Sequence, residues 1–304
     1  MPAEGPRELG FIGIGQMGRA MVENWLADGF RVRVFNRTRD KILPLLEKGA
    51  IEARSPAEAA IPGGILMSCV ADDAALLSVF EDDEVFRQLG PTGIHVSMST
   101  ILPQTARLLA ERHAQQGGIY VAAPVMGRPD AVAARRQTYY LSGPPEARQR
   151  VKPVLSPICR QVLELGDDPG AAHVAKLASN FLIATVVESL GEAFALVEKS
   201  GLPSRAFFET ITEFLFNCYV YKRYGEHLLS GRFSEPLFRL QLGFKDMQLL
   251  AQMAASSHTP MPFLSTLRDR YLSALAQGKG EWDWTAIVLE IRRQAGLADN
   301  TLSG

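Results

Sequence analysis

The sequence predicts an α/β fold, with a Rossmann-type N-terminal domain followed by an all-helical C-terminal domain that begins with a long interdomain helix. Short apolar runs alternate with helical patterns through the first half of the chain, which is typical of a mostly parallel sheet covered by helices. A glycine-rich turn follows the first apolar run. After Gly166 the alternation stops and one long apolar helical pattern begins. A length of 304 residues is sufficient for two such domains.

Individual elements follow from local patterns. Met17, Met21 and Trp25 recur at helical spacing before Gly29, a C-terminal capping residue. Residues 55–58, Ser-Pro-Ala-Glu, form a capping box that opens another helix. The predicted strands are residues 9–12, 31–35, 65–70, 94–98, 119–121, 138–141 and 161–165.

The two predicted domains are residues 1–166 and 167–304, separated by the turn-rich stretch 167–170. Residues 171–200 form one helix, which ends before Gly201 and Pro203. Apolar residues cover more than one side of this helix, so we expect it to be buried on several sides. We therefore expect a homodimer or homotetramer.

Composition excludes several classes of protein. The net charge of -1 argues against a nucleic-acid or anionic-membrane partner. Cys69, Cys159 and Cys218 are far apart and no histidine pair has ligand spacing, so we expect free thiols and no metal site. The N-terminus lacks a signal-like apolar core, and the apolar run 177–187 is too short for a membrane span. We expect a cytoplasmic protein.

The glycine-rich turn carries the first functional prediction. Gly13, Gly15 and Gly18 form a GxGxxG motif between a strand and a helix, which is the context that a dinucleotide-binding loop requires. The glycines allow a tight turn and bring the helix N-terminus to the phosphates. A purely structural glycine turn is the alternative.

The end of the second strand distinguishes between the two nicotinamide cofactors. NAD sites usually place a carboxylate there to hold the ribose 2′-hydroxyl. This chain has Asn36, Arg37 and Thr38, with no carboxylate before Asp40. A guanidinium suits a 2′-phosphate, so we expect NADP(H) as cofactor, the alternative being a solvated polar turn.

Six motifs in order make the chain resemble the β-hydroxyacid dehydrogenase family, which includes 3-hydroxyisobutyrate dehydrogenase and glyoxylate/succinic semialdehyde reductases. They are GFIGxGxMG at 10–18, STxxP at 99–103, a form of APVSGG at 123–128, a form of GxGxxxKxxxN at 170–180, KD at 245–246 and a form of GxxDxSA at 280–286. The resemblance implies an oxidoreductase that interconverts a small hydroxy acid and its aldehyde or keto acid.

The third motif departs from the family pattern. Met126 replaces its serine and Arg128 replaces its second glycine. Losing the hydroxyl puts the usual short 3-hydroxy acids in doubt. Arg128 either holds a substrate carboxylate or points into solvent.

Lys176 and Asn180 are four residues apart and therefore share one face of the long helix. An idle ammonium in this apolar stretch would be costly, which favours a catalytic lysine over a solvated one. His173 is expected to be a structural or surface histidine. The resemblance places the hydroxyls of Ser99 and Thr100 near the nicotinamide and substrate, and the same segment is also compatible with a helix N-cap before Pro103.

The resemblance implies three sets of site residues. The expected catalytic residues are Lys176, Asn180 and Ser99. The expected cofactor-binding residues are Gly13, Gly15, Gln16, Met17, Gly18, Asn36, Arg37, Thr38, Val70, Ala71, Thr100 and Lys245. The expected substrate-binding residues are Ser99, Val125, Met126, Gly127, Arg128, Lys176, Asn180 and Asp246. Two rival functions stay open, an imine reductase and a catalytically silent NADP-binding scaffold. Lys176 argues against both, because such relatives normally lack it.

Overall fold

The computed structural model describes residues 7–81 and 83–298. The chain divides into two compact units, the first ending at Lys176 and the second beginning at Leu177. This boundary falls inside helix α9 (Ala171–Lys199), whereas the sequence analysis places it in the turn before that helix. The predicted strand at 161–165 and residues 171–176 of α9 therefore belong to the same unit.

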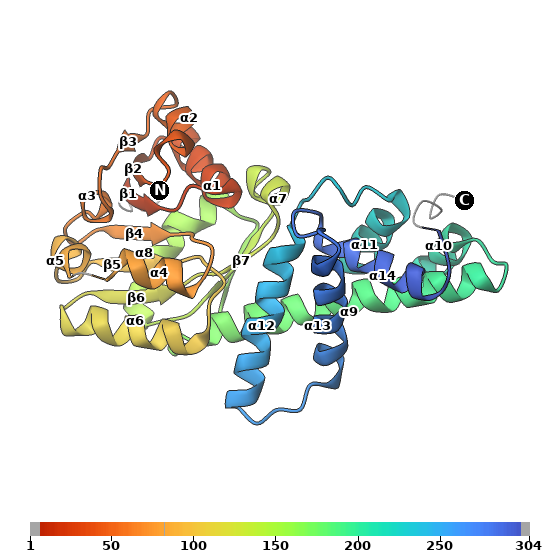
Figure 1. Cartoon of the computed structure of the whole chain (residues 1–304). Helices are drawn as coiled ribbons and strands as arrows, with labels where there is room; N and C mark the ends of the chain where they lie inside the picture. Colours follow the sequence, from red (N-terminus) through yellow and green to blue (C-terminus); the bar gives the residue numbers. More distant parts are fainter. Residues whose placement is uncertain (1–6, 82, 299–304) are drawn as a thin grey trace. The chain divides into compact units, whose positions relative to one another are not determined.

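The first unit is built on a six-stranded parallel sheet with the order β3-β2-β1-β4-β5-β6 (Figure 1). The strands are β1 (Glu8–Ile12), β2 (Arg31–Phe35), β3 (Ile51–Glu52), β4 (Ile65–Ser68), β5 (Ile94–Ser97) and β6 (Ile119–Ala122). The order reverses between β1 and β4, where open α/β sheets bind ligands outside the carboxyl ends of their strands. Every residue of β4 and β5 is buried, as expected for a sheet covered on both faces.

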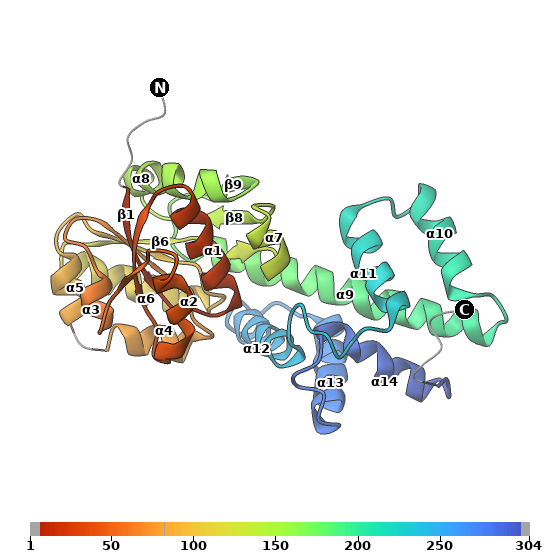
Figure 2. The same ribbon diagram turned by 90° about the horizontal axis from the view of Figure 1, so that it is seen from above.

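Helices cover both faces of this sheet (Figure 2). One face packs against α1 (Gln16–Ala27) and α8 (Pro145–Leu155), whose Trp25 and Val151 are fully buried. The other face packs against α3 (Pro56–Ala59), α4 (Asp73–Val79), α5 (Glu84–Leu89) and α6 (Pro103–Gln115). The shorter elements are α2 (Leu43–Leu46), α7 (Pro129–Ala133), and the 3₁₀ turns η1 (Arg39–Lys41) and η2 (Ser156–Ile158).

Two predicted helix-end signals are confirmed. The Ser55 hydroxyl accepts a hydrogen bond from the Glu58 backbone N–H at 3.1 Å. The Glu58 carboxylate in turn accepts a hydrogen bond from the Arg54 backbone N–H. Gly29 follows the end of α1 with φ +80°, a conformation that favours glycine.

A second, three-stranded sheet completes this unit. It comprises β7 (Val125–Met126), β8 (Thr138–Leu141) and β9 (Gln161–Glu164); β8 runs antiparallel to β7 and parallel to β9. The strands predicted at 138–141 and 161–165 are present, but they form this separate sheet. The sequence analysis does not predict β3 or β7, because two residues are too few to show a strand pattern.

The second unit is helical, and its described residues include no named strand. After α9 it contains α10 (Ser204–Phe214), α11 (Tyr219–Ser230), α12 (Leu240–Ser256), α13 (Pro262–Ala276), the 3₁₀ turn η3 (Trp284–Ala286) and α14 (Ile287–Gln294). A Cβ at Gly191 of α9 would lie 2.7 Å from the Val288 side chain, so glycine lets α14 pack closely there.

The length and composition of α9 correct one prediction. Its 29 residues, with a mean hydropathy of 1.5 over the most apolar stretch, have the length and composition of a membrane span. The expectation that the apolar segment of this helix is too short to span a membrane was therefore wrong. However, Glu188 of α9 pairs with Arg270 at 2.7 Å, and Glu198 pairs with Arg292 at 2.9 Å. These ion pairs tie α9 to neighbouring helices of its own unit, as in a core helix.

Candidate active site

The glycine loop has the geometry of a dinucleotide-binding turn. Gly13 follows β1 with φ +97°, and its N–H donates to the Phe35 carbonyl at 3.0 Å. A Cβ at Gly13 would lie 2.3 Å from the Cys69 carbonyl oxygen, and one at Gly18 would lie 2.3 Å from the Gly13 carbonyl oxygen. Neither backbone could give way, so both positions require glycine.

Gly15 is different, because a Cβ there would meet nothing within 4 Å. Gly15 is the N-cap of α1, no side chain caps this helix end, and its first turn carries no acidic residue. The first N–H groups of a helix have no intrahelical partner and favour an anion. The open space beside Gly15 therefore fits a phosphate group. Gln16 is exposed and Met17 half-buried in the same turn.

Asn36 holds the end of β2 against this loop. Its Oδ1 accepts from the Ile14 N–H at 2.8 Å, and its Nδ2 donates to the Thr38 carbonyl at 2.8 Å. The Asn36 side chain, predicted to bind the cofactor, thus uses its amide group to hold the glycine loop and the turn after β2 in place. Thr38 is exposed at the start of η1.

The two arginines beyond β2 are in different situations. Arg39 makes a two-pronged ion pair with Glu52, at 2.7 and 2.8 Å. Arg37 is exposed, and within residues 7–81 and 83–298 no hydrogen bond or ion pair engages its guanidinium. Arg37 is therefore the arginine available to a 2′-phosphate.

Ser99 links the carboxyl ends of β4 and β5. Its hydroxyl oxygen accepts from the Val70 N–H at 2.8 Å, and the residue is 2% exposed. Leu102 occupies the N-cap of α6 and makes no side-chain cap, so the interpretation of Ser99 and Thr100 as helix caps was wrong. Asp73 accepts from the Leu102 N–H instead. Ala71 lies exposed in the loop after β4.

The predicted substrate loop starts in β7 and ends at α7. Val125 and Met126 pair with Tyr139 and Thr138 of β8. Gly127 is required by a close approach, because a Cβ there would lie 2.8 Å from the Gln137 Cβ. Arg128 is the N-cap of α7, and its Nε lies 3.5 Å from Asp130 Oδ1. The guanidinium is thus held near the helix start by a long ion pair.

Helix α9 carries Lys176 and Asn180 one turn apart, and both are buried, with 8% and 5% exposure. The boundary between units follows Lys176, so Lys176 belongs with the glycine loop and Ser99, and Asn180 belongs with the helical unit. His173, one turn earlier, is fully buried and bonded to Tyr120 at 3.2 Å. This contact supports its predicted structural role.

Asp246 of α12 contacts two other predicted site residues within the helical unit. Asn180 Nδ2 donates to its Oδ2 at 2.6 Å, and Lys245 Nζ lies 3.0 Å from its Oδ1. Asp246 is 1% exposed. One oxygen thus accepts a hydrogen bond and the other takes part in an ion pair, which suits a residue that orients Asn180 and Lys245.

Asp283, from the last motif, is a structural hub that the sequence analysis did not assign. Its Oδ1 accepts from the N–H and hydroxyl of Thr285, and its Oδ2 accepts from the N–H groups of Leu237 and Phe238. His227 Nε2 lies 3.4 Å away, and these partners outweigh burial and lower the pKa of the Asp283 carboxyl.

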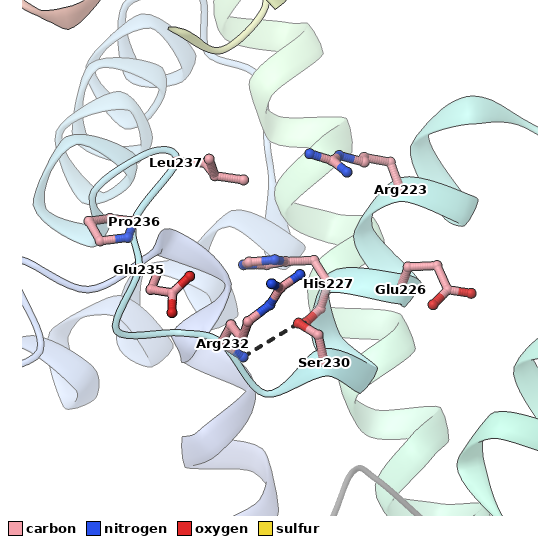
Figure 3. Close-up of a pocket in the computed structure, with 8 residues that line it drawn as sticks. All are labelled: Arg223, Glu226, His227, Ser230, Arg232, Glu235, Pro236 and Leu237. Atoms are coloured by element: carbon pink, nitrogen blue, oxygen red, sulfur yellow. Dashed lines mark hydrogen bonds between the residues drawn. The ribbon is translucent and has the colours of Figure 1, made fainter. Parts of the chain in front are cut away.

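His227 and Leu237 also line a hollow of about 560 Å³ in the helical unit (Figure 3). Arg223 and Arg232 stand on its wall together with Glu226 and Glu235. Two arginines matched by two glutamates favour neither an anion nor a cation. None of the predicted catalytic residues lines this hollow.

The fold and these residues define an NAD(P)-dependent oxidoreductase that acts on hydroxyl or aldehyde groups. Residues 8–166 match the NAD binding domain of 6-phosphogluconate dehydrogenase, and residues 170–291 match the family described as NAD-binding of NADP-dependent 3-hydroxyisobutyrate dehydrogenase. The chain belongs to the β-hydroxyacid dehydrogenase family and is an NAD(P)-dependent hydroxyacid dehydrogenase.

Two relatives cover almost the whole chain. An uncharacterized oxidoreductase of Bacillus subtilis, YfjR, is 35% identical over 92% of this chain and 98% of its own. The 3-sulfolactaldehyde reductase of Escherichia coli is 31% identical over 95% of this chain and 97% of its own.

Solved structures agree with this assignment. A 3-hydroxyisobutyrate dehydrogenase from Salmonella typhimurium is 26% identical, with a TM-score of 0.80 over 92% of this chain and 98% of its own. Psf3, solved in complex with NADP+ and 2-OPP, is 27% identical with the same TM-score and coverage. An imine reductase from Streptomyces aurantiacus shares the fold at 23% identity, with a TM-score of 0.61 over 93% of this chain and 99% of its own.

Proposed function

We propose that this protein is an NADP(H)-dependent reductase of a small anionic aldehyde or keto acid, with Lys176 as the general acid. The observation that carries the proposal is the buried Lys176, which belongs to the same unit as the glycine loop and Ser99. NADP(H) is favoured by the unengaged Arg37 beyond β2 and by the NADP+ bound to the similar protein Psf3.

The bound cofactor supplies the hydride for reduction and accepts it for oxidation. Hydride arrival at a carbonyl carbon leaves negative charge on the oxygen. The Lys176 ammonium stabilises that charge and then protonates the oxygen. In the oxidative direction, neutral Lys176 accepts the proton from the hydroxyl group.

Ser99 and Asn180 have supporting roles in this proposal. The Ser99 oxygen accepts from the Val70 N–H, which leaves the hydroxyl hydrogen for the substrate oxygen. Asn180, fixed by Asp246, orients the substrate without exchanging protons.

The substrate class follows from the loop after β7. Met126 offers no hydroxyl, and Arg128 brings a guanidinium that can hold a carboxylate or another oxyanion in a forked geometry. The similar protein from Escherichia coli is named for an anionic three-carbon aldehyde, 3-sulfolactaldehyde. We therefore assign the Arg128 guanidinium to the anionic end of the substrate, opposite the reacting carbonyl.

We also propose a homodimer or homotetramer in the cytoplasm. Large apolar side chains of the helical unit are exposed, among them Leu182, Leu196, Phe214, Leu215 and Tyr219, with exposed fractions from 60% to 74%. Exposed apolar side chains in this number are typical of a subunit interface. A single monomeric species in sedimentation at micromolar concentration would contradict this proposal.

The decisive experiment replaces Lys176 with alanine. We expect Lys176→Ala to bind NADPH normally while turnover falls a hundredfold or more, the size of a lost general acid. Lys176→Arg is expected to be almost as poor, because guanidinium does not readily release its proton. Near-normal turnover in Lys176→Ala with intact NADPH binding would remove Lys176 from the mechanism and favour the imine reductase alternative.

A further inference from the structure

The first turn of α9 is fastened to the strands of the Rossmann unit by buried polar contacts. Tyr120 of β6 and His173 of α9 meet through Oη and Nε2 at 3.2 Å, and they are 2% and 0% exposed. The Ser142 hydroxyl accepts from the Ala172 N–H at 3.1 Å. The start of α9 therefore has a defined axial position and rotation relative to the sheet.

A second clamp lies just before the helix. Arg107 holds Asp168 through two hydrogen bonds of 3.0 and 2.6 Å, and Asp168 accepts from the Gly170 N–H at 2.9 Å. A Cβ at Gly170 would lie 2.8 Å from the Arg107 guanidinium, so a larger residue there would displace the guanidinium from this position. The chain thus enters α9 along a fixed path.

Burying the Tyr120 hydroxyl and the His173 imidazole in a core costs desolvation free energy. Two apolar side chains of similar size would pack there without desolvating a phenol and an imidazole. Burial raises the pKa of the Tyr120 hydroxyl, which therefore stays protonated and can donate to His173. Hydrogen-bond direction gives such a pair a geometric specificity that apolar packing lacks.

His173 and Lys176 are three residues apart and are therefore neighbours on the helix surface. Asn180, by contrast, is held within the helical unit by Asp246. The Tyr120 and His173 contact lies within the same unit as Lys176, three residues before it along the helix, and it anchors this turn to the sheet.

We propose that Tyr120 and His173 are positioning residues that fix the first turns of α9 and thereby hold the Lys176 ammonium in line with the reacting oxygen. This inference rests on the proposed function, in which Lys176 is the general acid. A displaced lysine would still let cofactor and substrate bind, so the loss should appear in kcat and not in KM.

The test uses Tyr120→Phe, which removes one oxygen atom, together with His173→Leu, His173→Gln and the double variant. We expect Tyr120→Phe and His173→Leu each to lower kcat about 5- to 10-fold, the size of one lost hydrogen bond, with KM for NADPH and substrate within twofold. The double variant should be no worse than the poorer single variant, because both remove the same contact. His173→Gln, which keeps a polar group near Nε2, should recover most of kcat.

Tyr139→Phe is the matched control. Tyr139 is equally buried in the same unit, and its hydroxyl accepts from Gln137 at 3.2 Å, away from α9. We expect it to lower the melting temperature without changing kcat. An unchanged kcat in folded Tyr120→Phe, with Lys176→Ala still inactive, would overturn the positioning role and leave the proposed function standing. Near-normal turnover in Lys176→Ala would instead overturn both.

Discussion

Asn180 on α9 donates a 2.6 Å hydrogen bond to the carboxylate of Asp246 on α12, whose other oxygen lies 3.0 Å from Lys245 Nζ. One buried carboxylate thus fixes an amide and an ammonium that sequence alone assigns to substrate and cofactor. The KD motif therefore has unequal members, because Asp246 is enclosed by protein partners while Lys245 is 21% exposed.

Replacing Asp246 with asparagine should therefore disturb Asn180 and Lys245 together. Hydrogen bonds to a charged group contribute about 1.5–3 kcal/mol, so we expect kcat/KM for the aldehyde to fall roughly 10- to 150-fold in Asp246→Asn. Steady-state kinetics with saturating NADPH would measure this. Asp269→Asn, at an exposed position of α13, is the control and should be neutral. Unchanged kinetics in Asp246→Asn would show that Asn180 keeps its orientation without the carboxylate.

The preference for NADPH should depend on Arg37 and not on Arg39. Loss of a charge-assisted bond to the 2′-phosphate should weaken NADPH binding roughly 10- to 150-fold in Arg37→Ala and leave NADH binding nearly unchanged. Arg39→Ala removes a neighbouring arginine that is already paired with Glu52, so the NADPH-to-NADH ratio should stay close to wild type. Fluorescence titration with both cofactors would measure the ratio. An equal loss for both cofactors in Arg37→Ala would contradict the assignment.

Alanine substitutions at two glycines of the cofactor loop should have different effects, one on NADPH binding and the other on folding stability. Gly15→Ala places a methyl group in open space, so we expect a normal melting temperature but weakened NADPH binding, because the methyl group occupies the phosphate site. Gly18→Ala drives a Cβ to 2.3 Å from the Gly13 carbonyl oxygen and should destabilise the unit itself. Thermal unfolding with and without NADPH distinguishes the two effects. Wild-type NADPH affinity in Gly15→Ala would place the phosphates elsewhere.

Arg128 should discriminate between substrates by charge. We expect Arg128→Ala to raise KM for an anionic aldehyde roughly 10- to 150-fold, while KM for an uncharged aldehyde of the same length changes little. Arg128→Lys should recover part of the affinity, since an ammonium keeps the charge but not the forked geometry. Comparing succinic semialdehyde with butanal provides the matched pair. A uniform effect on both would mean that Arg128 acts only through its ion pair with Asp130.

Sequence patterns were sufficient for the regular parts of the fold. The strands with four or more residues, the glycine loop, the capping box at Ser55 and the long α9 all carry local signals of period or residue type. The two-residue strands β3 and β7 carry no such signal, because two residues are too few to show a strand period.

The site residues show the same division. The spacing of Lys176 and Asn180 predicts their shared helix, but the partners of Asn36, Ser99 and Asp246 depend on contacts between distant segments. Ser99 also shows how a local rule can mislead. A serine before Ile-Leu-Pro resembles a helix cap, yet its hydroxyl binds the backbone of the neighbouring strand's loop.

The boundary of the two units within α9 has a practical consequence for chimeric enzymes. A fusion joined in the turn at 166–170 would replace the first turns of α9, with His173 and Lys176, by those of the relative that supplies the helical domain. It would therefore break the contact between Tyr120 and His173. A fusion joined within α9 just after Lys176 would leave the lysine with its own strands. Only Asn180, Lys245 and Asp246 would then be exchanged as a set. Libraries that recombine helical domains from relatives should accordingly place their crossover inside the helix and not in the loop that precedes it.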